Sequence, residues 1–199
     1  PKPSACMTNM RNAVNYILFQ AGWLACVGAG LAGWMWYGPL AVVAILGLHL
    51  AFLTRPEQRA FELRLILVMG LAGTALDSIL FATGLVTYPS SEATWTLGMS
   101  PPWIAALWFL FGTLPRHSLA WITGRPVLAG VLGAIGGPMS FWAGQRLGAI
   151  GTGGAPVWTY GVLAAEYGVC LALCALLPSP KEPKATEDVN LSRSHSGAV

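Results

Sequence analysis

Residues 63–86 read LRLILVMGLAGTALDSILFATGLV, a run in which only Arg64 and Asp77 carry a charge. The hydrocarbon core of a bilayer is roughly 30 Å thick and is crossed by a helix of about 20 apolar residues. This run is long enough to cross it, and its apolar residues follow one another without the alternation that is typical of a β-barrel strand. The run therefore predicts a transmembrane helix.

Five other runs of the same kind predict further spans. The expected spans are residues 14–34, 38–53, 63–86, 102–122, 126–146 and 156–177. Hydrophobic residues make up 55% of the chain and charged residues 10%, whereas soluble domains have about 25% charged residues. Mean hydropathy is +0.60. We expect an all-α, polytopic transmembrane helix bundle, and this composition excludes a cytosolic enzyme, a nucleic-acid-binding protein and a disulfide-built secreted domain.

The distribution of basic residues predicts the orientation of this bundle. Of the eleven Lys and Arg residues, all but Arg146 fall on one side of the predicted spans. By the positive-inside rule, both termini are then cytoplasmic. The chain divides into a cytoplasmic N-terminal segment (1–13), a transmembrane domain (14–177) and a polar cytoplasmic tail (178–199) that we expect to be disordered.

Polar residues inside the spans are candidates for function, because an ionisable group there costs about 2.5–3.5 kcal/mol on insertion scales. Their depths along the predicted helices suggest two clusters. The outer cluster contains Asp77, Arg146 and Glu166, and the inner cluster contains Gln20, His49 and His117. Ser78 and Ser140 are further candidates for a polar pocket. The outer cluster is either a structural ion pair or a functional site such as a proton relay or headgroup pocket.

The fifth span contains Gly136, Gly137 and Pro138 in succession. Pro138 has no N–H to donate to the carbonyl of Ala134, and two glycines weaken the same turn. We expect a kink or break of the helix there, in the middle of the membrane.

Sequence motifs for metals and cofactors are missing. The histidines and carboxylates have no local ligand spacing such as H-x-x-x-H, so no metal site is predicted. The chain contains no P-loop, no G-x-S-x-G elbow and no dinucleotide fingerprint, so no cofactor is predicted and catalytic residues stay unassigned.

Several stretches together resemble a known family. They are Asn15-x-x-Leu18-Phe19-Gln20-x-Gly22-Trp23, Asp77-Ser78, Trp108 with residues 114–121, residues 136–144, and Glu166-Tyr167. With them the chain resembles, over residues 12–177, the bacterial inner-membrane family catalogued as domain-of-unknown-function family 2878. The family pattern has Asn where this chain has Arg116, so the polar chemistry at that point differs.

The resemblance implies a small protein of the bacterial inner membrane with about six spans. Members of this family are often encoded beside cyclopropane-fatty-acid-synthase-like methyltransferases and lipid-modifying oxidoreductases. This association suggests an accessory role in membrane-lipid (fatty-acyl) modification or lipid handling, with membrane lipids and a lipid-modifying enzyme or another membrane subunit as partners. The alternatives are a small proton-linked transporter that uses Asp77 or Glu166, a membrane-embedded enzyme with His117 and Asp77 as an acid–base pair, and a purely structural subunit.

Overall fold

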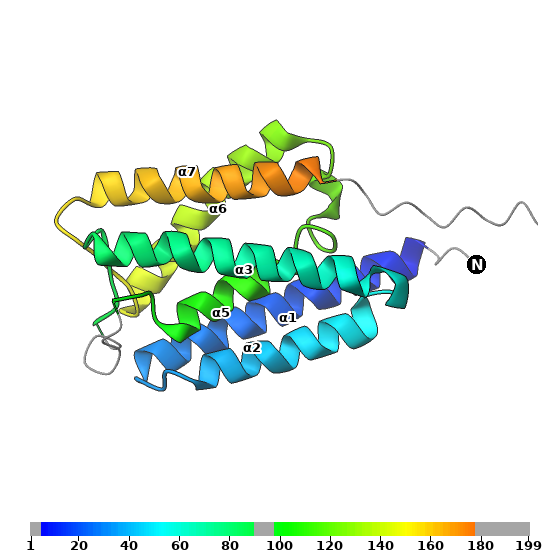
Figure 1. Cartoon of the computed structure of the whole chain (residues 1–199), viewed down its shortest axis with the longest axis horizontal. Coiled ribbons are helices and arrows are strands. Elements are labelled where there is room, and N and C mark those ends of the chain that lie inside the picture. The colour runs from blue at the N-terminus through cyan, green and yellow to red at the C-terminus, as the bar shows by residue number, and fades with distance from the viewer. Residues whose placement is uncertain (1–4, 90–97, 178–199) are drawn as a thin grey trace, which may run out of the picture.

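The computed structural model describes residues 5–89 and 98–177, in which six main helices run back and forth along one bundle (Figure 1). They are α1 (Ala5–Leu31), α2 (Tyr37–Leu48), α3 (Arg59–Ala82), α5 (Pro102–Phe111), α6 (Pro126–Leu147) and α7 (Pro156–Leu176). The start of α1 and the end of α7 lie at the same end of the bundle, on the right in Figure 1. We call it the terminal end and the opposite one the far end.

Two of the predicted segments lie at the termini of the chain. Helix α1 already begins at Ala5, so residues 5–13 of the predicted N-terminal segment are helical. The predicted tail, 178–199, lies outside the described residues.

Proline and glycine set several helix boundaries. Pro102, Pro126 and Pro156 each occupy the first position of their helix, where the missing N–H costs no helical hydrogen bond. Helix α6 ends at Leu147, and Gly148 follows with φ of 88°. This left-handed conformation is accessible to glycine and turns the chain away from the helix axis.

The bundle has the composition of a membrane protein. Within the described residues, four helical stretches are long and apolar enough to cross a bilayer: Cys6–Leu31, Pro56–Ala82, Pro126–Leu147 and Pro156–Leu176. Two apolar helices, Tyr37–Leu53 and Pro102–Phe111, are shorter. Large apolar side chains also cover the outer surface; Val127 and Val157 are 81% and 83% exposed. Because lipid rather than water can cover such a surface, the fold is that of an integral membrane protein.

The fourth predicted span, residues 102–122, is wrong in length. Helix α5 ends at Phe111, and the chain continues through turns and a short 3-10 helix, η3 (Ala120–Ile122). Gly112 and Pro115 explain the difference, since glycine weakens a helix and proline disfavours helical geometry at the residue before it. This 112–125 segment lies at the terminal end and leads into α6 (Figure 1).

Close helix contacts depend on glycine. A Cβ atom at Gly73 on α3 would overlap the ring of Trp108 on α5, and one at Gly137 on α6 would overlap the ring of Tyr167 on α7. Small residues of this kind let helix backbones approach in lipid. Helix α6 stays helical through Pro138 to Leu147, so of the expected kink or break at Gly136-Gly137-Pro138 a break is excluded. Packing of this turn against α7 accounts for its persistence.

Two short strands join loops at the far end. Strand β1 (Val86–Thr87) pairs antiparallel with β2 (Gly151–Thr152), with Val86 opposite Thr152 and Thr87 opposite Gly151. The pairing connects the segment after α3 with the α6–α7 connection. It was not predicted from the sequence.

Candidate functional site

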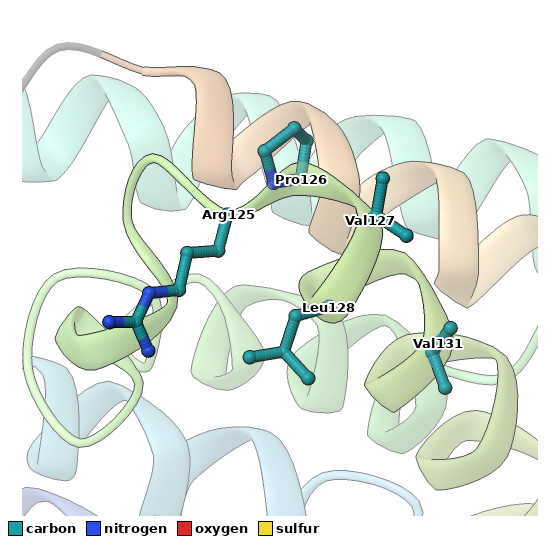
Figure 2. A pocket seen from close by; sticks show the side chains of 5 residues that line it. All are labelled: Arg125, Pro126, Val127, Leu128 and Val131. Atoms are coloured by element: carbon teal, nitrogen blue, oxygen red, sulfur yellow. The ribbon is translucent and has the colours of Figure 1, made fainter.

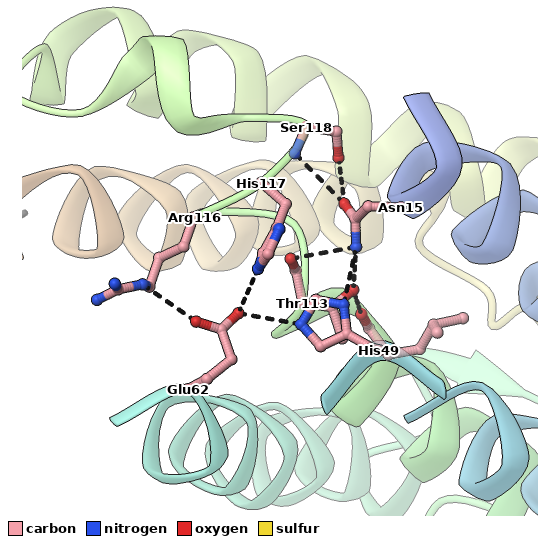
Figure 3. A network of polar contacts seen from close by, with 8 residues as sticks. Asn15, His49, Glu62, Thr113, Arg116, His117 and Ser118 are labelled. Atoms are coloured by element: carbon pink, nitrogen blue, oxygen red, sulfur yellow. Dashed lines mark hydrogen bonds and ion pairs between the residues drawn. The ribbon is translucent and has the colours of Figure 1, made fainter. Parts of the chain in front are cut away.

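A cluster of polar side chains at the terminal end is centred on the carboxylate of Glu62 (Figure 3). Its members, which we call the Glu62 cluster, are Asn15, His49, Glu62, Thr113, Arg116, His117 and Ser118. The Nε2 atoms of His49 and His117 lie 3.2 and 3.3 Å from Oε1 of Glu62. Nε of Arg116 lies 3.1 Å from Oε2. Glu62 is 1% exposed, so this buried carboxylate has a partner for each oxygen.

Three segments of the chain position these groups. Helix α2 continues as a π-helix, η1 (His49–Leu53), which begins at His49. Single π-helical turns of this kind occur frequently at functional sites. After a single 3-10 turn (Pro56–Gln58), Glu62 lies in the first turn of α3, where the helix dipole favours a negative charge. Arg116 and His117 directly follow Pro115 in the 112–125 segment.

Asn15 ties α1 to the cluster. Its Nδ2 lies 3.4 Å from Nδ1 of His49 and donates to Oγ1 of Thr113 at 3.2 Å and to the Thr113 carbonyl at 3.4 Å. Its Oδ1 accepts from Oγ of Ser118 at 2.6 Å and from the Ser118 backbone N–H at 3.3 Å. Asn15 thereby contacts one side of the His49 ring while Glu62 contacts the other.

The accessible side of the cluster is formed by Arg116 and His117. The side chains of both are 12% exposed. Burial lowers the pKa of the Arg116 guanidinium, and the Glu62 carboxylate opposes that shift. The guanidinium carbon also lies 4.5 Å from the centre of the Phe61 ring. Arg116 and Glu62 together are neutral, so the cluster has no net charge when both imidazoles are neutral.

A second polar site, the carboxyl pair of Asp77 and Glu166, joins α3 to α7. Nε1 of Trp108 donates to Oδ2 of Asp77 at 2.6 Å, and the Trp108 ring stacks on Tyr167 with centroids 4.6 Å apart. Oδ1 of Asp77 and both carboxylate oxygens of Glu166 are buried without a hydrogen-bond partner among the described residues. The two carboxyl groups interact electrostatically with each other.

Tyr88 marks where this pair lies. Burial raises the pKa of the Tyr88 hydroxyl well above its ordinary value, and the Asp77 and Glu166 carboxylates raise it further. Tyr88 directly follows strand β1, so the carboxyl pair is nearer the far end than the Glu62 cluster. Asp77 also lies about four turns beyond Glu62 on α3, or roughly 22 Å along the helix.

This separation corrects one prediction. His117 contacts Glu62, and it does not form the predicted acid–base pair with Asp77, whose Oδ2 is bonded to Trp108. An embedded enzyme built on His117 and Asp77 is therefore not supported by the geometry.

The predicted inner cluster is partly assembled. The rings of His49 and His117 meet edge to face with centroids 4.5 Å apart. Gln20 lies on an exposed position of α1 instead. The central residue, Glu62, was missed because the third span was expected to begin at residue 63. Pro56 at the first position of the preceding 3-10 turn was the available signal for an earlier start.

The predicted outer cluster forms without Arg146, the cation that was expected in it. Asp77 and Glu166 come together, but Arg146 is exposed and its guanidinium carbon lies 5.8 Å from the centre of the Trp142 ring. Among the described residues, Arg146 forms no ion pair with either carboxylate. The reason is position: Arg146 is in the last turn of α6, pointing to the surface.

Ser78 and Ser140 take part in helix contacts. Oγ of Ser78 donates to the carbonyl of Thr74 at 2.6 Å and lies 3.2 Å from Oγ of Ser100. Oγ of Ser140 accepts from Nε1 of Trp23 at 3.0 Å, which links α6 to α1. A common pocket lined by the predicted site residues is thus not formed.

A shallow, open groove of about 510 Å³ lies on the surface at the start of α6 (Figure 2). It is lined by Arg125, Pro126, Val127, Leu128 and Val131. Four of these five side chains are apolar, and Arg125 lies where the 112–125 segment enters the helix.

The fold and these sites define a polytopic helical membrane protein with polar groups buried at two depths. The model of a family described as "Protein of unknown function (DUF2878)" matches residues 12–173, and the chain belongs to this family. The resemblance noted from the sequence is thereby confirmed. No curated protein and no solved structure matches the chain.

Proposed function

We propose that the protein handles membrane lipids and binds an anionic phospholipid at the start of α6, with an acyl chain in the groove. The observation that supports this proposal is the lining of the groove, which is apolar along α6 and includes Arg125, the residue directly before the helix (Figure 2). A phospholipid needs the same combination, an apolar wall for its chain and a cation for its phosphate.

The depth of Arg125 favours a headgroup as its partner. Helix α6 is long enough to span a bilayer, and Arg125 directly precedes it. Its guanidinium is therefore expected where the helix leaves the hydrocarbon, at the level of the phosphates. The free N–H groups of the first turn of α6 add positive partial charge there. Charge complementarity thus favours an anionic headgroup over a neutral one.

The proposal extends to location and partners. Arg55, Arg59, Arg64, Arg116 and Arg125 belong to segments at the terminal end. We propose that this end faces the cytoplasm of a bacterial inner membrane. The family resemblance supports an accessory role beside an enzyme that modifies membrane lipids.

Native mass spectrometry of the protein released from nanodiscs tests lipid binding. The discs contain equal amounts of phosphatidylglycerol and phosphatidylcholine, and the measurement is the ratio of the two lipids retained. Charge-assisted hydrogen bonds contribute about 1.5–3 kcal/mol, so Arg125→Gln should lower retention of phosphatidylglycerol by roughly tenfold or more. Arg64→Gln, which removes an exposed arginine of α3, is the matched control and should change little.

A second variant tests the groove itself. Leu128→Trp fills the groove without changing charge, and it should reduce retention of both lipids. Wild-type retention in Arg125→Gln and in Leu128→Trp, with both proteins folded by circular dichroism, would contradict the proposal.

A specific observation favours a second candidate, a small proton-linked transporter. Oδ1 of Asp77 and both carboxyl oxygens of Glu166 are buried with no hydrogen-bond partner among the described residues. Intramembrane carboxyl groups of this kind are typical of proton relays. If the pair carries protons, Glu166→Gln and Asp77→Asn should abolish pH-gradient dissipation in vesicles. Glu57→Gln, at an exposed carboxylate, should leave it intact. Vesicles containing wild type that are no leakier to protons than empty ones would exclude this candidate.

A further inference from the structure

Three potential metal ligands converge within the Glu62 cluster. His49, Glu62 and His117 each offer one ligand atom, and these atoms all lie within 4.8 Å of one another. We propose that they form a binding site for a divalent transition-metal ion of the Zn²⁺ type. The prediction of no metal site rested on missing local spacing, but the fold brings the three residues together from α3, the π-helix after α2 and the 112–125 segment.

Two of the three separations between the ligand atoms already match those of a tetrahedral ion. Zinc binds His nitrogen and carboxylate oxygen at about 2.0–2.2 Å, so two ligands of a tetrahedral ion lie about 3.3–3.5 Å apart. Nε2 of His49 lies 3.2 Å from Oε1 of Glu62, and Nε2 of His117 lies 3.3 Å from the same oxygen. Two edges of the tetrahedron are therefore present. Only the separation of the two nitrogens has room to shorten.

Neighbouring residues support the ligands from outside. Oε2 of Glu62 is occupied by Arg116 at 3.1 Å, which leaves Oε1 for the ion. Nδ1 of His49 faces the side-chain amide of Asn15 at 3.4 Å. Hydrogen bonds to the second nitrogen of a ligating histidine fix its ring and raise its basicity. Glu62 therefore has its outer partner in place, and the Asn15 amide lies within reach of Nδ1 of His49.

The proton positions distinguish the empty site from the occupied one. Without metal, both imidazoles can donate an Nε2–H to Glu62. An ion on Nε2 requires each neutral ring to carry its proton on Nδ1 instead. The Asn15 amide must then turn over, so that Oδ1 rather than Nδ2 faces His49, and Oδ1 gives up the hydrogen bonds that it accepts from Ser118. Replacing Asn15 by Asp provides this acceptor directly.

The composition and exposure of the site indicate which ion fits. Two imidazoles and one carboxylate suit Zn²⁺ and its borderline neighbours better than Mg²⁺ or Ca²⁺, which prefer oxygen ligands. His49 and Glu62 are buried, whereas the His117 side chain is 12% exposed. A fourth ligand, water or an anionic group, can approach from the side of His117.

Cobalt(II) is the probe, because a tetrahedral cobalt site has strong visible absorption bands. The full-length protein in detergent is stripped with a chelator and titrated with Co²⁺. We expect tetrahedral bands that saturate near one equivalent and disappear when Zn²⁺ is added. Loss of an outer partner costs about 10–100-fold in affinity, so His117→Ala, which removes a ligand, should cost at least ~100-fold. His195→Ala, which removes the remaining histidine of the chain, should bind like wild type.

Two results decide the proposal independently of whether removing a ligand harms folding. Asn15→Asp should tighten Co²⁺ binding by roughly tenfold or more, because a carboxylate then faces Nδ1 of His49. A purely structural cluster gives no such gain. Folded wild-type protein that shows no tetrahedral cobalt bands, or bands that persist unchanged in folded His117→Ala, would overturn the proposal.

Discussion

The Glu62 cluster and the Asp77–Glu166 pair both bury carboxyl groups in one bundle, but their surroundings are opposite. Both oxygens of Glu62 face cationic or N–H groups. At the pair, a single indole N–H reaches Oδ2 of Asp77, and three other carboxyl oxygens have no partner among the described residues. The first arrangement matches an ionised carboxylate, which is costly to leave unpaired. The second has no cation to match a charge.

The difference shows that burial alone does not define what a carboxyl group does in a membrane protein. At the Glu62 cluster, neutralising the carboxylate leaves a buried cation, Arg116, without its counter-charge. At the pair, neutralising a carboxyl group leaves no described cation unpaired. Replacing a carboxyl group by a neutral amide should therefore have unequal effects on stability at the two sites.

The largest effect is expected for Glu62→Gln. Arg116 then remains mostly buried without its counter-charge, and breaking such a pair costs about 3–5 kcal/mol of unfolding free energy. Denaturant unfolding in detergent, followed by circular dichroism, measures the loss. Replacing both residues, Glu62→Leu with Arg116→Met, should recover most of it, since apolar substitutes for a buried pair are often neutral. Equal losses in the single and double variants would show that the ion pair is not the cause.

A smaller effect on stability is expected for substitutions at Gly136 and Gly137. These adjacent glycines lie on α6, which packs against the helix that carries Glu166. A Cβ atom at Gly137 overlaps the Tyr167 ring, whereas one at Gly136 meets no described atom within 4 Å. Gly137→Ala should lose about 1–3 kcal/mol of unfolding free energy by overpacking. Gly136→Ala should gain about 0.5–1 kcal/mol through helix propensity. Thermal unfolding in the same detergent compares the two. Similar melting temperatures for the two variants would mean that α6 and α7 are not packed closely at Tyr167.

The next effect concerns a polar contact outside both sites. Ser140→Ala removes the acceptor of the Trp23 indole N–H, and we expect a loss of about 0.5–1.5 kcal/mol of unfolding free energy. Combined with Glu62→Gln, the losses should add to within about 0.5 kcal/mol, because the sites share no partner. A double-mutant cycle measures this, and a larger interaction energy would indicate that the terminal end and the α1–α6 contact unfold as one coupled network.

The smallest effect is expected at the carboxyl pair. Glu166→Gln removes no hydrogen bond to a described residue, so the unfolding free energy should change by less than about 1 kcal/mol. The same denaturant experiment used for Glu62→Gln gives the direct comparison. A loss as large as that of Glu62→Gln would mean that the Glu166 carboxylate is ionised and held by a group outside the described residues.

The sequence predicted the helices better than the sites because apolar length is a local property. Residues 63–86 and 126–146 were recognised as spans from their composition alone. The fourth predicted span is too long because it was based on the continuous run of apolar residues. Pro115 within that run is a signal against helix, since proline disfavours helical geometry at the residue before it. The ladder of β1 and β2 involves two residues on each strand, too few for a periodic pattern.

The sequence predicted which side chains come together only where a polar residue lies inside an apolar run. His49 and His117 attracted attention as polar groups in apolar runs, and they do meet. In the predicted topology Glu62 lies in the loop before the third span. Its role depends on the π-helix and on the path of the 112–125 segment, which together bring residues more than fifty positions apart into contact. Arg146 was expected beside Asp77 and Glu166 because its depth was estimated along the helix, and depth says nothing about the face on which a side chain lies.

The ladder at the far end also has a mechanical consequence. It fastens the segment after α3 to the α6–α7 connection by backbone pairing. Any rocking of the α6–α7 hairpin against the other helices must then pivot near this ladder and be greatest at the opposite end. The start of α6, with its groove, is at that opposite end (Figure 1). The lever arm is the length of α6 itself, about 33 Å for a helix of 22 residues, so a small rotation at the pivot becomes a large displacement of the start of α6 and of the groove it carries.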